Sequence, residues 1–228
     1  MARALVDSGV VHVERSLRHG ESLTRAATGV DVLILAVPDA AIAEVAVKIA
    51  VRTDTVIAHL SGATALDALH PHPRRASLHP LVPLSEPVAG ATALTGAWMA
   101  LAGDPVIERV ADALKARVVR VEESDRAAYH AAAVIASNHL IALLGQVERV
   151  AEPLGVPLEA YFDLAAAALE NTRRIGPARA LPGPVSRGDW LTVAAHIQAI
   201  APDQRAAYVE MAKQAARLAG REWPRELG

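Results

Sequence analysis

Cysteine is absent from the 228 residues, and aromatic side chains make up only 3% of them. Without cysteine the chain has no disulfide, thiol nucleophile or thiolate metal site, which suits a reducing compartment. The formal net charge of -2 gives no basic field for nucleic acid or for an anionic membrane. These absences exclude several classes of function, while the 52% hydrophobic content is enough for a sizeable core.

The sequence also lacks long uninterrupted apolar runs. The stretch that looks most apolar, Val32–Val51, is interrupted by a proline and by three charged residues, so it lacks the run that a membrane span needs. The first residues, MARALVDSG, have no apolar signal core. We therefore expect a soluble, cytoplasmic protein that binds neither membrane nor nucleic acid.

Strand-like and helix-like segments alternate along the first half of the chain. Short β-branched or apolar runs predict strands at Val10–Val13, Val32–Val37, Thr55–Leu60, Trp98–Ala102 and Val118–Val121. Helices are predicted between them at Gly20–Ala27, Ala40–Ala50 and Pro105–Leu114, the last capped by Asp104. Strands that are apolar on both faces are typical of parallel sheets covered by helices, so we expect a doubly wound α/β domain.

From Ser124 onward every predicted element is a helix. These helices cover Ser124–Glu152, Leu158–Arg173, Trp190–Ile200 with Asp189 as its cap, and Gln204–Ala219 with Asp203 as its cap. A proline- and glycine-rich loop is predicted at Gly176–Gly188. We therefore expect an α/β domain of residues 1–123 and an all-α domain of residues 124–228.

The beginning of the chain is unusual for a doubly wound nucleotide-binding domain. Such a domain opens with a strand, a glycine turn and a helix whose N-terminus holds the pyrophosphate. This chain opens with ARALVDSG, which is typical of the end of that helix. The sequence therefore predicts a sheet that lacks its first strand and glycine loop. A late start codon, a shortened chain or a short natural protein would each explain this.

Five strings together carry a resemblance to a known family. They are AVPDAAIAEVA at Ala36–Ala46, HLSGATALDAL at His59–Leu69, SLHPL at Ser77–Leu81, YHAAAVIASNHLIALL at Tyr129–Leu144 and GPARALPGPVSRGDWLTVAAHI at Gly176–Ile197. They resemble the Rossmann-type oxidoreductases that carry a C-terminal helical domain of unknown function. That family is similar in plan to ketopantoate reductases, pyrroline-carboxylate reductases and β-hydroxyacid dehydrogenases, which include 6-phosphogluconate dehydrogenase. The resemblance implies an NADP-dependent enzyme that forms a homodimer through its helical domain.

Charged residues after the first predicted strand bear on the choice of cofactor. In Rossmann domains the end of this strand meets the adenosine ribose, where an acid selects NAD and arginine accommodates the phosphate of NADP. Glu14 favours NAD, whereas Arg15, Ser16 and Arg18 favour NADP. We therefore predict NADP, and the alternative is a solvated charge cluster.

The ends of the next two strands supply further cofactor candidates. Val37 and Pro38 would form an apolar wall for the nicotinamide or ribose, and Asp39 would cap the following helix. Ser61 offers a hydroxyl, and Gly62 allows a ligand to approach the backbone closely. The alternative is that both dipeptides are ordinary turns.

Histidines and prolines cluster in the segment PHPRRASLHPLVP, which we expect to be a rigid loop. His79-Pro80 resembles the turn after the last cofactor-side strand of related dehydrogenases. The segment contains His72 and His79, with His70 just before it and His59 at the end of the preceding predicted strand, but no acidic or cysteine partner completes a ligand set. We therefore predict no metal site.

The helix that begins at Ser124 carries the catalytic candidates. His130, Ser137 and Asn138 share one face by helical spacing, and in so apolar a helix they would need polar partners, such as a bound substrate. The resemblance implies a proton donor on this helix. No lysine is present there, so we nominate His130 as the proton donor, Asn138 to orient the carbonyl and Ser137 to contact the substrate. The alternative is a core histidine and a core amide.

An arginine in the second domain completes the candidate set. Arg187 and Asp189 flank Gly188 just before a helix, where arginine would bind a substrate carboxylate. Alternatively, Arg187 pairs with a neighbour and Asp189 only caps the helix.

We therefore expect an NADP-dependent reductase of a small 2-oxo acid, with ketopantoate as the leading substrate. These 228 residues alone should bind NADP weakly, because the glycine loop is not among them. The alternative is a non-catalytic binding or assembly protein of the same fold.

Overall fold

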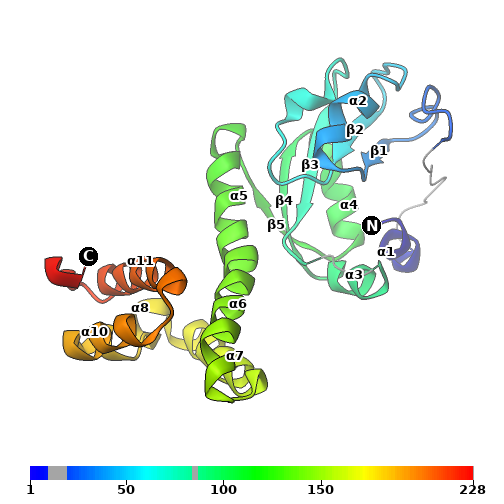
Figure 1. The fold of residues 1–228 in the computed structure, drawn as a ribbon. Coiled ribbons are helices and arrows are strands. Elements are labelled where there is room, and N and C mark those ends of the chain that lie inside the picture. Colours follow the sequence, from blue (N-terminus) through cyan, green and yellow to red (C-terminus); the bar gives the residue numbers. More distant parts are fainter. Residues whose placement is uncertain (10–19, 84–86, 228) are drawn as a thin grey trace. The chain divides into compact units, whose positions relative to one another are not determined.

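The computed structural model describes residues 1–9, 20–83 and 87–227, and it divides into two compact units (Figure 1). The first unit is Met1–Ser137 and the second is Asn138–Gly228. The division falls within the long helical stretch that follows the sheet, whereas the sequence placed it ahead of that stretch, at Glu123.

A sheet of five described strands forms the centre of the first unit (Figure 1). The strands are β1 (Val32–Leu35), β2 (Val56–His59), β3 (Arg75–Pro80), β4 (Trp98–Gly103) and β5 (Arg117–Arg120), and they lie side by side in that order. The pairs β1–β2, β2–β3 and β4–β5 are parallel, and β3–β4 is antiparallel. The predicted strand Val10–Val13 lies outside the described residues.

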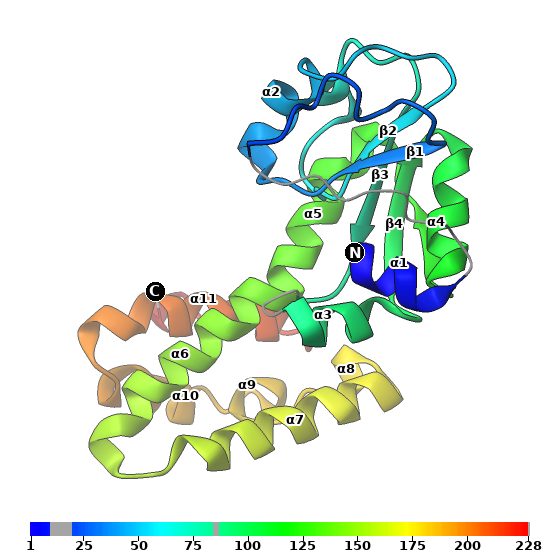
Figure 2. The same cartoon turned by 90° about the vertical axis from the view of Figure 1, so that its right-hand side faces the viewer.

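Side chains that alternate along the strands pack into two apolar clusters, one on each face of the sheet. Val56 and Ala58 of β2 pack with α1 (Ala2–Ser8) and α4 (Glu108–Ala113), which lie on one face together with α3 (Pro87–Leu94) (Figure 2). Ile57 packs on the opposite face with α2 (Ile42–Ala46) and the 3₁₀ turn Leu66–Leu69. Helices on both faces confirm the predicted doubly wound α/β domain.

The predicted rigid loop around His79 is instead the central strand β3. Ala76, Ser77 and Leu78 are buried between β2 and β4, and Pro80 stands at the end of the strand, where a missing N–H costs little. The prolines suggested a loop, but they lie at the end of the strand or outside it and do not interrupt it. The antiparallel β3–β4 pair likewise departs from the expected parallel order, although helix α3 lies between these two strands in the chain.

Three further segments of the first unit differ in how well the sequence predicted them. Gly20–Ala27 forms turns and not a helix. Helix α3 arose where none was predicted. Asp104 does cap the segment that begins at Pro105, because its carboxylate accepts a hydrogen bond from the Val106 N–H at 3.0 Å.

The second unit is helical, as predicted. Its described helices are α6 (Leu140–Ala151), α7 (Leu158–Ile175), α8 (Pro177–Ala180), α9 (Pro184–Arg187), α10 (Trp190–Ala199) and α11 (Pro202–Leu218), followed by a 3₁₀ turn at Arg225–Leu227. The short helices α8 and α9 occupy the predicted loop, because each begins with a proline at a position where its missing N–H needs no acceptor. Helix α11 begins at Pro202, so Asp203 lies inside its first turn and is not the cap.

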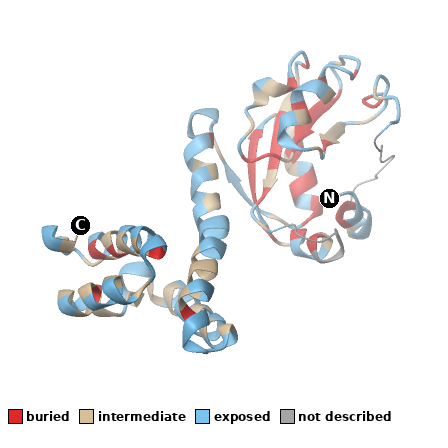
Figure 3. Ribbon diagram, in the orientation of Figure 1, coloured by how far each residue is buried: buried red, intermediate tan, exposed pale blue. Residues whose placement is uncertain are grey.

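The long helical stretch is continuous but not uniform. It runs through a 3₁₀ turn (Glu123–Asp125), α5 (Arg126–Val134), a π-helical segment (Ile135–His139), α6 and a 3₁₀ turn (Glu152–Leu154). Much of it is exposed (Figure 3). By length and composition alone this helix, Glu123–Leu154, is apolar enough to cross a membrane.

Candidate functional site

Polar side chains gather where β2 and β3 end. His59 is the last residue of β2, and its register partner on β3 is Ser77. Both side chains are buried, on the face of the sheet that Ile57 also points to, and His79 follows two residues later on the same face. Ligands of open α/β sheets bind beyond the carboxyl ends of the strands, so this is the candidate site.

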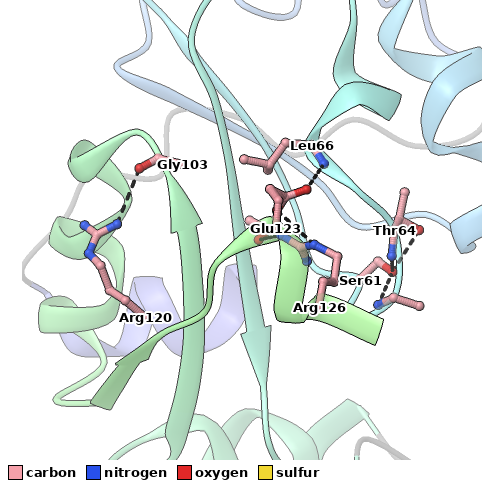
Figure 4. Close-up of polar contacts among 9 residues, drawn as sticks. Ser61, Thr64, Leu66, Gly103, Arg120, Glu123 and Arg126 are labelled. Atoms are coloured by element: carbon pink, nitrogen blue, oxygen red, sulfur yellow. Dashed lines mark hydrogen bonds and ion pairs between the residues drawn. The ribbon is translucent and has the colours of Figure 1, made fainter. Parts of the chain in front are cut away.

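A buried guanidinium joins the start of the long helix to the sheet (Figure 4). Arg126 is only 5% exposed; its Nη2 donates to the Ser77 hydroxyl at 3.0 Å, and its Nε donates to Glu123 Oε1 at 2.9 Å. The other oxygen of Glu123 accepts the Leu66 N–H at 3.0 Å. Burial alone would raise the pKa of the Glu123 carboxyl, but Arg126 and Leu66 hold it below its usual value.

The loop after β2 is closed by Ser61 (Figure 4). Its hydroxyl accepts the N–H groups of Ala63 and Thr64 and lies 2.6 Å from Asp39 Oδ2, to which it donates. The Asp39 carboxylate therefore holds this loop. The sequence had predicted that Asp39 caps the helix after β1, and that prediction was wrong. The Ser61 hydroxyl, proposed for the cofactor, is likewise engaged within the protein.

Helix α5 brings a tyrosine against the end of β3. Tyr129 Oη lies 2.6 Å from His79 Nδ1, and the two rings meet edge to face with centroids 5.6 Å apart. Burial raises the pKa of the Tyr129 phenol, an effect that the charge of Arg126 partly offsets. Burial also lowers the pKa of the His79 imidazole, as do the charges of His130 and Arg126, while Asp39 opposes them.

Gly62 packs directly against two imidazole rings. A Cβ at this position would lie 2.7 Å from His130 Nδ1, 2.7 Å from His79 Cε1 and 2.8 Å from His79 Nδ1. The space that we expected a ligand to use is thus filled by the two histidines. His130 Nδ1 is buried and makes no hydrogen bond with any described residue.

His59 is fully buried, and neither of its ring nitrogens has a hydrogen-bond partner among the described residues. Burial lowers its pKa to about 4, and the charge of Arg126 acts in the same direction, against smaller opposing effects of Asp39 and Glu123. The ring is therefore neutral at physiological pH.

The remaining cofactor candidates are placed only in part. Arg15, Ser16 and Arg18, proposed to select NADP, lie outside the described residues. Val37 is half-buried against the apolar cluster beneath it, and Pro38 is exposed, directly after β1. An exposed apolar step at the end of β1 suits the wall that we predict for a nicotinamide.

Ser137 and Asn138 lie in the π-helical segment, and both are exposed. The Ser137 hydroxyl donates to the Ala133 carbonyl at 2.8 Å. The extra residue of a π turn breaks the regular spacing from which we placed these residues on one face with His130. The expectation that the helix buries Asn138 was therefore wrong, and His130 is only half-buried.

Arg187 and Asp189 belong to the second unit. Asp189 caps α10, as one reading of the sequence predicted, because its carboxylate accepts the Thr192 N–H at 3.2 Å and the Thr192 hydroxyl at 2.7 Å. These hydrogen bonds lower the pKa of Asp189, with a smaller contribution from the charge of Arg187. Arg187 is the exposed last residue of α9 and stays the candidate for an anion.

Sequence reasoning missed four polar residues of the site: Ser77, Glu123, Arg126 and Tyr129. Tyr129 was quoted in the family string but given no role. Glu123, Arg126 and His130 recur at intervals of three and four residues, which a helix turns to one side, and this spacing was a usable signal. Ser77 opens the quoted string SLHPL but was likewise given no role, because only the pairing of β3 with β2 puts it beside His59.

Replacing Gly62 with alanine should disrupt the site, because the new methyl would overlap both imidazoles. We expect loss of the His79–Tyr129 hydrogen bond and destabilisation by about 1–3 kcal/mol, as for other overpacked positions. Gly145→Ala is the control: its Cβ would meet only Arg149 Nη1, at 3.7 Å, and alanine should stabilise α6 by up to about 1 kcal/mol. Histidine side-chain NMR and denaturant unfolding would measure both effects, and unmoved His79 and His130 signals in Gly62→Ala would contradict the packing.

Acid should destabilise the first unit through His59. Its folded pKa of about 4 lies below the ordinary histidine value, so the unfolded chain binds the proton first as the pH falls from 6.5 towards 4. Stability is fully present above pH 6.5 and should fall by about 3 kcal/mol at most across this window. Hydrogen exchange of β2 and β3 amides at several pH values would measure it. His59→Gln should flatten the decline, and an unchanged slope would show that His59 is not its cause.

Comparisons with known proteins agree with this architecture. A Rossmann-like domain model matches residues 7–84, and the model described as domain of unknown function DUF2520 matches residues 93–215. No curated protein matches the chain significantly.

Solved structures share the fold. Protein TM1727 from Thermotoga maritima is 26% identical with a TM-score of 0.72, over 82% of this chain and 77% of that one. Protein BF3122 from Bacteroides fragilis is 16% identical with a TM-score of 0.68, over 82% and 75%. Pyrroline carboxylate reductase from Plasmodium falciparum, solved with NADP bound, is 10% identical with a TM-score of 0.57, over 94% and 92%. With a Rossmann-like domain followed by the helical domain that its model describes, this chain belongs to the DUF2520 family.

Proposed function

We propose that the protein is an NADP-dependent reductase of a small 2-oxo acid, with ketopantoate as the leading candidate. One observation carries the proposal. Two imidazoles, His79 and His130, are packed on Gly62 beyond the strand ends, where Rossmann-like domains bind their ligands. The similarity in fold to a reductase solved with NADP bound supports the same cofactor here.

The residues present fit the cofactor in part. Val37 and Pro38 would face the nicotinamide, and Arg15, Ser16 and Arg18 would meet the adenosine phosphate. Ser61 and Gly62 would contribute to cofactor binding indirectly, by fixing the loop after β2. The Ser61 hydroxyl donates to Asp39, and Gly62 packs against the two imidazoles. When bound, the reduced cofactor supplies the hydride.

The protein's own chemistry is the delivery of a proton. We assign to the imidazolium form of His130 the donation of a proton to the substrate oxygen, since imidazole exchanges protons near neutral pH. Asn138 and Ser137 would orient the carbonyl, and the exposed guanidinium of Arg187 would bind the carboxylate in a bidentate fork. Asp189 would serve that arginine indirectly, by capping the helix that follows.

The test is NADPH oxidation with ketopantoate, simple 2-oxo acids and pyrroline-carboxylate. It should be run on this chain and on the same chain joined behind the strand and glycine loop of a related reductase. We expect turnover of the 2-oxo acids by the joined chain, and His130→Ala should lower kcat by ~10²–10⁴-fold. His139→Ala, an exposed histidine of the same helix, is the matched control.

Two results would contradict the assignment. One is preference for the imine, and the other is no turnover of any carboxylate substrate with NADPH still bound. The latter would favour the alternative, a non-catalytic binding protein. A His130→Ala variant that turns over normally but unfolds earlier would make His130 a structural residue.

We further propose that the protein forms a homodimer through its helical region. Large apolar side chains are exposed along α6 and α7, with Ile141 68% exposed and Leu164 66% exposed. An apolar surface of this kind is typical of a contact between subunits. The same apolar surface on a second copy of the chain would bury these side chains.

Light scattering at micromolar concentration should therefore give twice the monomer mass. Ile141→Asp should weaken dimerisation at least about tenfold, because a charge would enter an apolar interface. Val47→Asp is the control, since Val47 is similarly exposed but lies in the first unit. A parent chain that is monomeric, or equal dissociation constants for the two variants, would count against this interface.

A further inference from the structure

Among the residues that the structure describes, two histidine–tyrosine pairs have nearly the same geometry. In the first, His79 Nδ1 lies 2.6 Å from Tyr129 Oη, with the rings at 87°. In the second, His196 Nδ1 lies 2.8 Å from Tyr208 Oη, with the rings at 83°. The first pair lies at the candidate site and the second lies in the helical unit, so the second serves as an internal control.

The direction of the first hydrogen bond follows from acidity. A phenol O–H is a better donor than the N–H of a neutral imidazole, and the unprotonated imidazole nitrogen is the better acceptor. Tyr129 therefore donates to His79 Nδ1. A neutral His79 ring carries one proton, so that proton must be on Nε2. The pKa of the Tyr129 phenol is raised, which keeps it protonated, and the pKa of the His79 imidazole is lowered, which keeps it neutral. Both directions agree with this assignment of donor and acceptor.

Gly62 orients both rings in the same sense. The Nδ1 atoms of His79 and His130 lie at the glycine, 2.8 Å and 2.7 Å from the place a Cβ would take. Nδ1 of His79 is engaged by Tyr129, and Nδ1 of His130 is buried at the glycine with no partner in the described chain. A ligand would therefore have to bind these rings at their Nε2 atoms.

A second histidine lies close enough to affect the protonation of His79. The ring centroids of His79 and His130 are 5.9 Å apart, so a charge on His130 disfavours a charge on His79. Burial and the positive charge of Arg126 also lower the pKa of His79, so this ring stays neutral.

We propose that the Nε2–H of His79 donates a hydrogen bond to the carbonyl oxygen of the substrate, with Tyr129 as the positioning residue that fixes this tautomer. The inference rests on the reductase function proposed above. When bound, the reduced cofactor would supply hydride to the carbonyl carbon, and negative charge would then develop on the carbonyl oxygen. His130 in its imidazolium form gives that oxygen a proton and becomes neutral. His79 keeps its own proton and stabilises the developing negative charge.

The tautomer is testable on the protein as it is, without cofactor. Long-range ¹H–¹⁵N spectra of the histidine side chains at pH 7 should show His79 protonated on Nε2 and unprotonated on Nδ1. Tyr129→Phe should convert His79 to a mixture of tautomers and leave His196 unchanged. Tyr208→Phe should do the reverse. A His79 ring that carries its proton on Nδ1, that is doubly protonated at pH 7, or that ignores Tyr129→Phe would overturn the inference.

The donor role is tested in the NADPH assay. His79→Gln should lower kcat by ~10²–10³-fold with a smaller change in KM, as for loss of an oxyanion donor. Tyr129→Phe should lower kcat about tenfold, the size of one hydrogen bond. Tyr208→Phe should match the parent.

The two proposals fail in different ways. Full activity of His79→Gln in a parent that turns over would overturn the role of His79 and leave the reductase intact. No turnover by the parent would refute the reductase, and the role of His79 with it, whereas the tautomer assignment is still judged by the spectra.

Discussion

The buried guanidinium of Arg126 is the contact on which the site depends. It reaches from the first turn of α5 to Ser77 in the middle of the sheet, and it holds Glu123, whose second oxygen binds the backbone of Leu66. One side chain thus connects the central strand, the loop after β2 and the start of the long helix. A buried ion pair adds little net stability because desolvation offsets the attraction, but it specifies one arrangement. Here that arrangement sets where Tyr129 and His130 meet the end of β3.

The same charge governs the histidines around it. His59 is kept neutral by burial and by Arg126, and His79 is kept neutral by burial, by His130 and by Arg126. A positive group in the floor of a site also favours a ligand that carries or develops negative charge. The reduction of a carbonyl develops such a charge on oxygen, so the electrostatics and the proposed chemistry agree.

Glycine at position 62 is a packing requirement in this structure. Any side chain would displace the imidazoles, which are held in turn by Tyr129 and by the end of β3. The loop, the strand and the helix therefore constrain one another through short side chains. Such mutual constraint holds reacting groups in one geometry, and preorganisation of this kind lowers the cost of reaching the transition state.

Periodicity in the sequence determined the elements and their class. Continuous apolar runs such as Val32–Val37 predicted strands, Asp104 and Asp189 predicted helix starts, and the absence of strand-like runs after Ser124 predicted the helical domain. His130 was nominated because the resemblance implies a proton donor on this helix and no lysine is present there. These features depend on residues near one another in the chain, so local patterns suffice to find them.

Tertiary structure alone decided the pairing of β3 with two neighbours, which turned a proline-rich segment into the central strand. It also decided that Asp39 binds Ser61 and that Tyr129 binds His79, 50 residues away in the chain. The π-helical segment displaced Asn138 from its expected face. Each of these outcomes depends on contacts between distant segments, whose energies no local window of sequence contains.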